Sequence, residues 1–237
     1  MPFEGWDFSY LNNRWDDESL PWDYNKIVKS YLKNEYKLLD IGTGDGKVLL
    51  TFNHPYHNTF VTEGYKPNYE ICMEKLNPLG IKVFNYAGDK KFDLIDNNSF
   101  DIVINRHESY DEEELYRILK PGGIYITQQV GTYNNKDLAS FFDEKNIELF
   151  PNLTLEKSIK RLEKYNFQIK YSNEYYPILK FYDLGAIAYF AKIIKWEFID
   201  FSVNKYIDKF ILLQDLIKEK GFISSKQHRF IIVAQKV

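Results

Sequence analysis

The chain has 237 residues, a formal net charge of −3 and 44% hydrophobic residues, which is enough to bury a large core in one substantial domain. This balance excludes a general basic surface for nucleic acid, although it leaves a local patch open. The single cysteine, Cys72, excludes an internal disulfide and a cysteine-rich metal site. Because no apolar run reaches about 18 residues and no signal-peptide pattern occurs, the sequence predicts a soluble, cytoplasmic protein without a metal.

The first 34 residues are dense in aromatic and charged side chains and show no clear period, apart from a predicted helix over 25–32. Two interpretations remain open for this segment. It is either a strap packed over the core or a lid over a cofactor and its substrate. We favour the lid, because a glycine-rich loop follows directly, and in that case Trp6, Trp22 and Tyr24 would face the substrate.

A glycine-rich stretch follows the first predicted strand. Lys37 to Ile41 is an apolar run that contains one acid, Asp40, and it is typical of a buried strand. Glycines then stand at 42, 44 and 46, and a glycine lets a ligand approach the backbone closely because it has no Cβ. A helix predicted from Val48 would point its N-terminal N–H groups back at this turn. The pattern therefore predicts a cofactor loop.

The spacing of this loop limits the kind of cofactor. A dinucleotide fingerprint reads G-x-G-x-x-G, and here the third glycine comes one residue early. Asp40 and Asp45 would repel a pyrophosphate, whereas they suit a cationic ligand that carries hydroxyl or ammonium groups. The alternative is an ordinary turn in which Asp45 caps the following helix. The motif alone leaves both interpretations open.

Strands and helices alternate through residue 130. Strands are predicted over 59–63, 82–86, 99–104 and 124–130, and helices over 68–76 and 111–119. Such alternation predicts a parallel sheet that is covered on both faces. The second strand ends on Glu63, and in doubly wound folds an acid at this position holds the hydroxyls of a ribose.

The alternation is less regular in the last hundred residues. A helix over 155–165, a strand over 167–176, a helix over 203–220 and a final strand over 229–235 are predicted. We interpret residues 181–220 as an insertion that walls a substrate pocket, with Tyr189 in its wall. The sequence thus predicts a single domain, 1–237, made of an N-terminal lid (1–34), a cofactor-binding core (35–135) and a C-terminal part (136–237).

Four separated pieces of this sequence resemble one family. They are Leu38–Gly46, Val61–Glu63, Asp89 ahead of Asn98–Val103, and Leu119–Gly123. In this order they resemble the motifs of the class I S-adenosylmethionine-dependent methyltransferases, particularly the type 11 group. The resemblance implies an α/β, Rossmann-like, doubly wound sheet of seven mostly parallel strands with an antiparallel last strand. It also implies S-adenosylmethionine as cofactor and S-adenosylhomocysteine as product.

The resemblance also implies roles for individual residues. The glycine loop would pass under the methionyl part, Asp40 would reach its amino group, and Glu63 would hold both ribose hydroxyls. Asp89 would face the adenine amino group near the Lys90 backbone. The full set of expected cofactor residues is Asp40, Gly42, Thr43, Gly44, Asp45, Gly46, Glu63, Gly64, Asp89, Lys90 and Asn105, the last at the methyl side. Tyr65–Asn68 departs from the usual short polar residues after the second acid, and Lys47 also differs from many relatives.

Three residues after the fourth strand are candidates for catalysis. Methyl transfer is an in-line displacement that depends mostly on positioning, and a base is needed only when the nucleophile begins protonated. His107 could act as that base with Glu108 orienting it, while Arg106 could hold an anionic group of the substrate. The alternative, that His107 and Glu108 only form hydrogen bonds within a loop, remains equally open.

The fifth strand carries two adjacent amides, Gln128 and Gln129. A buried amide without a partner is costly, so at least one of them is expected to face a substrate pocket or a hydrogen-bonded network. A small-molecule acceptor is favoured over an RNA base because the chain is acidic overall and lacks an appended basic domain. The sequence also leaves open an NAD(P)-dependent oxidoreductase and a non-catalytic module that binds S-adenosylmethionine.

Overall fold

The computed structural model describes residues 8–145 and 152–237, so Trp6 and its predicted role lie outside the described residues. The chain groups into two compact units. One unit contains 22–129, 154–174 and 230–237, and the described residues of the other are 8–21, 130–145, 152–153 and 175–229. The predicted single-domain organisation stays a prediction, and the two units are described separately below.

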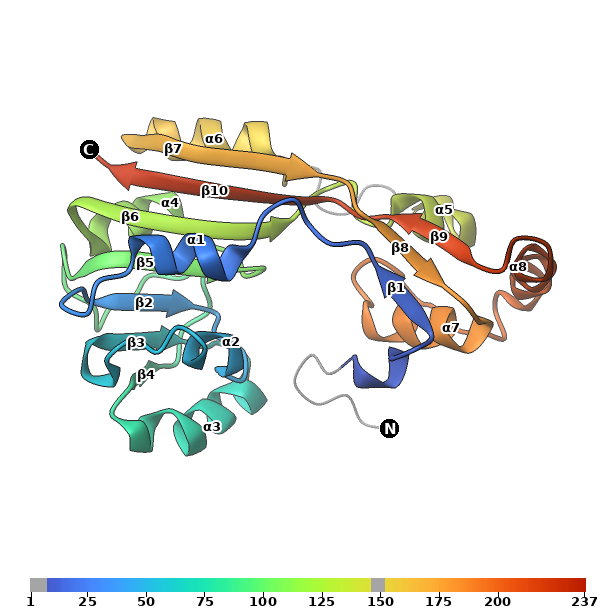
Figure 1. Cartoon of the computed structure of the whole chain (residues 1–237), viewed down its shortest axis with the longest axis horizontal. Coiled ribbons are helices and arrows are strands. Elements are labelled where there is room, and N and C mark those ends of the chain that lie inside the picture. Colours follow the sequence, from blue (N-terminus) through green and yellow to red (C-terminus); the bar gives the residue numbers. More distant parts are fainter. Residues whose placement is uncertain (1–7, 146–151) are drawn as a thin grey trace. The chain divides into compact units, whose positions relative to one another are not determined.

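The first of these units is built on a seven-stranded sheet with the order β4-β3-β2-β5-β6-β10-β7. The strands β2, β3, β4, β5 and β6 pair in parallel, and Figure 1 shows β10 running against its neighbours. This confirms the predicted α/β, Rossmann-like sheet. The strand bounds are β2 Leu38–Ile41, β3 Thr59–Thr62, β4 Lys82–Phe84, β5 Phe100–Arg106, β6 Leu119–Val130, β7 Phe167–Tyr175 and β10 Arg229–Lys236.

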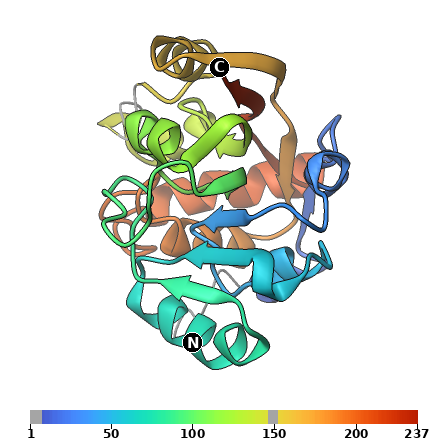
Figure 2. The same ribbon diagram turned by 90° about the vertical axis from the view of Figure 1, so that its left-hand side faces the viewer.

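Helices flank this sheet on both sides. Figure 2 shows α1 and α4 on opposite sides of the strands. Because both faces are covered, β2 is buried at every position. Three helices begin at a side-chain cap that accepts a backbone N–H three residues on, at Asp23, Asp111 and Thr154. The helices are α1 Tyr24–Tyr31, α2 Lys47–Leu50, α3 Lys66–Lys75, α4 Glu112–Ile118 and α6 Leu155–Lys164.

The other unit contains a small sheet with the order β1-β8-β9, in which both pairings are antiparallel. Its strands are β1 Trp15–Asp17, β8 Ile178–Phe181 and β9 Ile223–Lys226, and its helices are α5 Lys136–Phe142, α7 Leu184–Ile193 and α8 Ile207–Lys220. The rings of Phe198, Phe201, Tyr206 and Phe210 surround Phe142 at centroid distances of 5.3–6.2 Å. An aromatic cluster around Phe142 therefore lies in the core of this unit, together with aliphatic residues such as Leu138 and Ile187.

None of the helices in residues 8–145 and 152–237 has both the length and the apolar character needed to cross a membrane.

A buried lysine fastens the last strand to the rest of the sheet. Lys236 is 7% exposed, and its Nζ donates to Asn98 Oδ1 at 2.9 Å and to the carbonyls of Tyr116 and Leu119 at 2.6 and 2.7 Å. Burial lowers the pKa of this ammonium. Because three acceptors depend on one cation, the end of β10 depends on this residue.

We expect Lys236→Met to lower the free energy of unfolding by about 2–4 kcal/mol, because it leaves buried oxygens without donors. Urea unfolding followed by circular dichroism measures this change. Lys220→Met, at the exposed end of α8, serves as the control and should shift stability by less than about 0.5 kcal/mol. Equal effects of the two substitutions would contradict a special role for Lys236.

Candidate functional site

The topology of the larger sheet defines where a ligand would bind. β2 pairs with β3 on one side and with β5 on the other, so the order of the strands reverses between β2 and β5. Ligands of open α/β sheets bind at such a switch point, outside the carboxyl ends of the strands. The loop after β2 contains Gly42–Gly46, and the loop after β5 contains His107–Ser109, so both candidate loops lie at this edge.

The three glycines of the first loop have different surroundings. Gly42, Gly44 and Gly46 have φ angles of 69°, 66° and 75°, in the left-handed region that favours glycine. A Cβ on Gly42 would lie 2.5 Å from the Glu108 side chain, and one on Gly46 would lie 2.8 Å from Leu76. A Cβ on Gly44 would meet nothing within 4 Å. Two glycines therefore make room for the chain's own side chains, while Gly44 faces open space.

The Glu63 carboxylate is fixed at the end of β3. It is 5% exposed, and its two oxygens accept hydrogen bonds from Gly44 N at 2.8 Å and from Tyr65 N at 2.9 Å. Burial raises its pKa, and the negative charge of Glu108 adds to the rise. Each carboxylate oxygen has a further lone pair, so Glu63 keeps acceptor capacity for a ligand.

Two aspartates lie on either side of the glycine loop. Burial raises the pKa of Asp40 to about 7, and the charge of Glu63 adds to this rise while Arg106 opposes it. Asp45 instead accepts a hydrogen bond from Lys47 N at 3.1 Å and pairs with Lys47 Nζ at 2.6 Å. This bond to the residue two positions on is an Asx turn and not the predicted cap, because Gly46 is the N-cap of α2 and no side-chain cap bond forms there. Contact of Asp45 with a cofactor stays a prediction.

Buried amides hold the loop after β5. Asn105 Oδ1 accepts from Gln129 Nε2 at 2.8 Å, and Gln129 also donates to the Glu108 carbonyl at 2.9 Å. On the other face of β6, Gln128 Oε1 accepts from Trp22 Nε1 at 2.8 Å. Both glutamines therefore belong to hydrogen-bonded networks, as their burial requires.

The structure brings the three candidate catalytic residues to the same loop but gives them different neighbours. His107 is exposed, and its Nε2 lies 3.3 Å from Gln128 Nε2. Glu108 packs against Gly42, and its Oε1 accepts from Ser109 Oγ at 2.9 Å. The roles of His107 as base and of Glu108 as its orienting group stay predictions.

The aromatic residues expected near a substrate are divided between the two units. Tyr24 is 7% exposed, donates from its hydroxyl to the Asn105 carbonyl at 3.4 Å, and lies under the exposed Arg106 at 6.0 Å from the ring centroid. Tyr189 belongs to the other unit, where it lines a cavity of about 320 Å³ with Ala188, Phe201 and Val203. Tyr24 is therefore brought to the switch point, whereas Tyr189 lines a cavity within its own unit.

The remaining expected cofactor residues lie around β4 and the glycine loop. Asp89 and Lys90 are exposed and pair with each other at 3.8 Å. Gly64 lies against Ala87, since a Cβ there would be 2.7 Å from the Ala87 backbone. The Thr43 hydroxyl is buried near Asp40, and it lowers the pKa of that carboxyl against the effect of burial.

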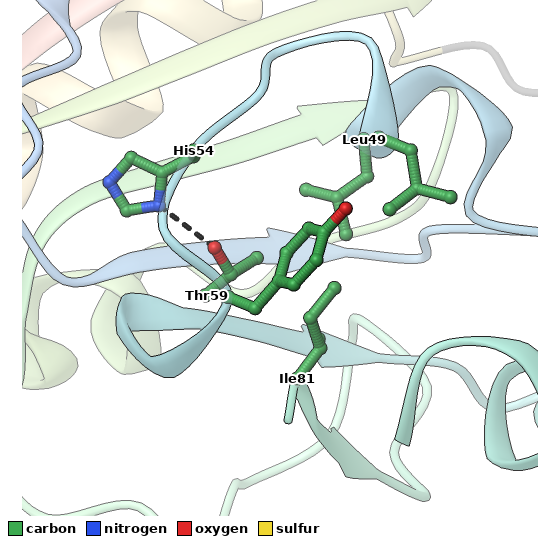
Figure 3. Close-up of a pocket in the computed structure, with 6 residues that line it drawn as sticks. Leu49, His54, Thr59 and Ile81 are labelled. Carbon is green, nitrogen blue, oxygen red and sulfur yellow. Dashed lines mark hydrogen bonds between the residues drawn. The ribbon is translucent and has the colours of Figure 1, made fainter. Parts of the chain in front are cut away.

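A further depression does not belong to this site (Figure 3). It is lined by Leu49, His54, Thr59 and Ile81, and His54 Nδ1 lies 2.8 Å from Thr59 Oγ1. Thr59 begins β3 and Ile81 precedes β4, so the depression lies at the amino ends of the strands. Its cavity volume is about 0 Å³, which leaves no room for a ligand.

Within residues 8–145 and 152–237, no group of three His, Cys, Asp or Glu residues is arranged to hold a metal ion.

The raised pKa of Asp40 predicts a dependence of stability on pH. The folded state holds this proton more tightly than the unfolded chain does, so Asp40 favours folding at low pH and loses this contribution as the pH rises through about 7. We expect Asp40→Asn to be more stable than the wild type at pH 8, by about 1–3 kcal/mol. Urea unfolding at pH 5 and pH 8 should show the gap closing at the lower pH. The exposed Asp208→Asn is the control, and a gap independent of pH would contradict the assignment.

Comparison with known proteins supports the fold. No protein-family model matches this sequence, and no curated protein matches it. A Bacillus halodurans C-125 protein assigned as a methyltransferase is similar in structure, with a TM-score of 0.60, 16% identity, and coverage of 90% of this chain and 98% of that one. Phosphoethanolamine N-methyltransferase 2 of Haemonchus contortus, in complex with S-adenosyl-L-methionine, is also similar. Its TM-score is 0.55 and its sequence identity is 19%, over 91% of this chain and 52% of that one.

A third similar structure, the 4+2 cyclase SpnF, has a TM-score of 0.51 and 13% identity, over 90% of this chain and 79% of that one. At these identities the likeness shows the fold. The described chain thus has the class I, Rossmann-like fold that these methyltransferases share.

Proposed function

We propose that this protein is an S-adenosylmethionine-dependent methyltransferase that acts on a small molecule. The observation that carries the proposal is the Glu63 carboxylate, buried at the switch point and bonded to Gly44 of the glycine loop. A carboxylate in this place suits a ribose diol, because its oxygens can accept from two hydroxyls. The fold of the methyltransferases compared above agrees with this assignment.

The residues present fit this cofactor. The open space at Gly44 leaves the backbone accessible to a ligand. The charge of Glu63 raises the pKa of Asp40, and the charge of Glu108 raises the pKa of Glu63. These acidic surroundings favour a ligand with sulfonium and ammonium groups over one with a pyrophosphate. When bound, the cofactor supplies a methyl group on a positively charged sulfur.

The chain's own residues would then position the acceptor. Under this proposal, Asn105 lies at the methyl side, and Asp89 with the Lys90 backbone lies at the adenine. Arg106 would hold an anionic group of the acceptor. His107 would take a proton at a ring nitrogen when the nucleophile starts protonated. Tyr24 and Trp22, which are buried against Asn105 and Gln128, would help to hold the acceptor in line with the methyl group.

A small acceptor agrees better with the chain than RNA does, since the net charge is −3. One similar structure, of the Haemonchus contortus enzyme, contains phosphomonomethylethanolamine with S-adenosylhomocysteine. We accordingly infer a small-molecule acceptor. Membership of the type 11 group and a cytoplasmic location are proposed from the sequence pattern alone.

A second candidate is a protein that binds S-adenosylmethionine without transferring its methyl group. The similarity to the cyclase SpnF is the observation that favours this second candidate. It indicates that a protein with this fold need not be a methyltransferase. Detection of methyl transfer from labelled S-adenosylmethionine to any acceptor would decide for the methyltransferase.

Calorimetric titration tests the cofactor directly. We expect S-adenosylmethionine and S-adenosylhomocysteine to bind with micromolar dissociation constants and NAD to show no binding. Tight binding of NAD, or no binding of either adenosyl compound, would contradict the proposal.

Glu63→Gln tests the residue that carries it. The substitution removes the charge and one acceptor, so we expect S-adenosylhomocysteine to bind about 10- to 100-fold more weakly, the scale of a lost charged hydrogen bond. Glu70→Gln on the exposed side of α3 is the matched control and should leave affinity unchanged. Unchanged affinity of a folded Glu63→Gln protein would remove Glu63 from the site.

A further inference from the structure

Asn68, in the first turn of α3, buries a polar atom that has no partner. The residue is 3% exposed, and its Oδ1 accepts no hydrogen bond from the described part of the chain. Leaving a buried amide oxygen unpaired costs about 1–3 kcal/mol, so native structures rarely contain one without a reason. A ligand that donates to this oxygen would supply that reason.

The packing of α3 shows where this oxygen is directed. Asn68, Cys72 and Leu76 follow one another at intervals of four residues, and therefore lie on one side of the helix. Cys72 Sγ donates to the Gly44 carbonyl at 3.1 Å, and the Leu76 side chain lies where a Cβ on Gly46 would be. The stripe thus follows the glycine loop, and Asn68 is its member nearest the helix start.

The start of α3 is also the place where Glu63 is anchored. Tyr65, the residue before the helix, donates its N–H to Glu63 Oε1 at 2.9 Å. Helical side chains lean toward the N-terminus, which directs Asn68 toward the Glu63 end of the loop. An amide oxygen accepts hydrogen bonds, so the complementary ligand group is a donor. A pair of vicinal hydroxyls offers two O–H donors, one for Glu63 and one for Asn68.

We propose that Asn68 Oδ1 accepts a hydrogen bond from one ribose hydroxyl of the adenosyl ligand, while the Glu63 carboxylate accepts from the other. This inference rests on the proposed function. Asn68 would then be a positioning residue that distinguishes ribose from deoxyribose. It lies in the segment 65–68, where the sequence departs from the family pattern, and it is absent from the residues that the resemblance implies.

The test combines stability with binding. Asn68→Leu replaces the unpartnered amide by an apolar group of similar size, so we expect its unfolding midpoint in the absence of ligand to equal or exceed that of the wild type. Its affinity for S-adenosylhomocysteine should fall about 10-fold. Asn77→Leu, at an exposed position beyond α3, is the matched control and should keep wild-type affinity.

Analogues of S-adenosylhomocysteine that lack the 2′- or the 3′-hydroxyl locate the contact. Both analogues should bind the wild type about 10-fold more weakly, because one loses the hydrogen bond to Glu63 and the other the bond to Asn68. For the analogue that lacks the Asn68 bond, Asn68→Leu should cause no further loss. If Asn68→Leu binds both analogues about 10-fold more weakly than the wild type does, the proposal is overturned and Asn68 is structural. A lower unfolding midpoint or misfolding of Asn68→Leu would lead to the same conclusion. Failure of the wild type to bind S-adenosylhomocysteine at all would instead refute the proposed function.

Discussion

The candidate site depends on one buried carboxylate. Glu63 joins the end of β3 to the glycine loop through Gly44 and to the start of α3 through Tyr65. These two bonds add to the bonds from Gly42 and Thr43 to the Thr62 carbonyl and from Cys72 to the Gly44 carbonyl, which join the same three segments. Because the bonds use the backbone, they set the shape of the loop whatever its side chains are, and they leave lone pairs for a ligand. The surroundings of the switch point follow from this arrangement.

Holding several acids together has a cost in stability. Burial raises the pKa of both Asp40 and Glu63, and each nearby negative charge adds to the effect. The unpartnered oxygen of Asn68 adds a polar group that the described part of the chain does not satisfy. Such a concentration of unfavourable groups at a switch point is typical of a binding site, where a ligand supplies the missing partners.

Much of the larger sheet could be predicted from the sequence, because buried parallel strands appear as short apolar runs between helices. The glycine loop and Glu63 could be found for the same reason, since each directly follows such a run. The small sheet could not be found this way. β1 reads Trp-Asp-Asp and β9 reads Ile-Ser-Ser-Lys, and neither has an apolar run.

Two features of the site also depend on contacts between distant residues. Gly42 is required because Glu108 packs against it, and only the fold brings these residues together. Asn68 looks like an ordinary helix-start residue until its burial is known. The catalytic roles of Arg106, His107 and Glu108 remain predictions, since the described geometry does not include an acceptor.

The most direct test of the account is a crystal structure of the protein with S-adenosylhomocysteine. We predict that one ribose hydroxyl donates to the Glu63 carboxylate, that the other donates to Asn68 Oδ1, and that the homocysteine part passes over Gly44. A ligand bound elsewhere, or bound at this loop with its ribose turned away from Glu63, would contradict the central claim.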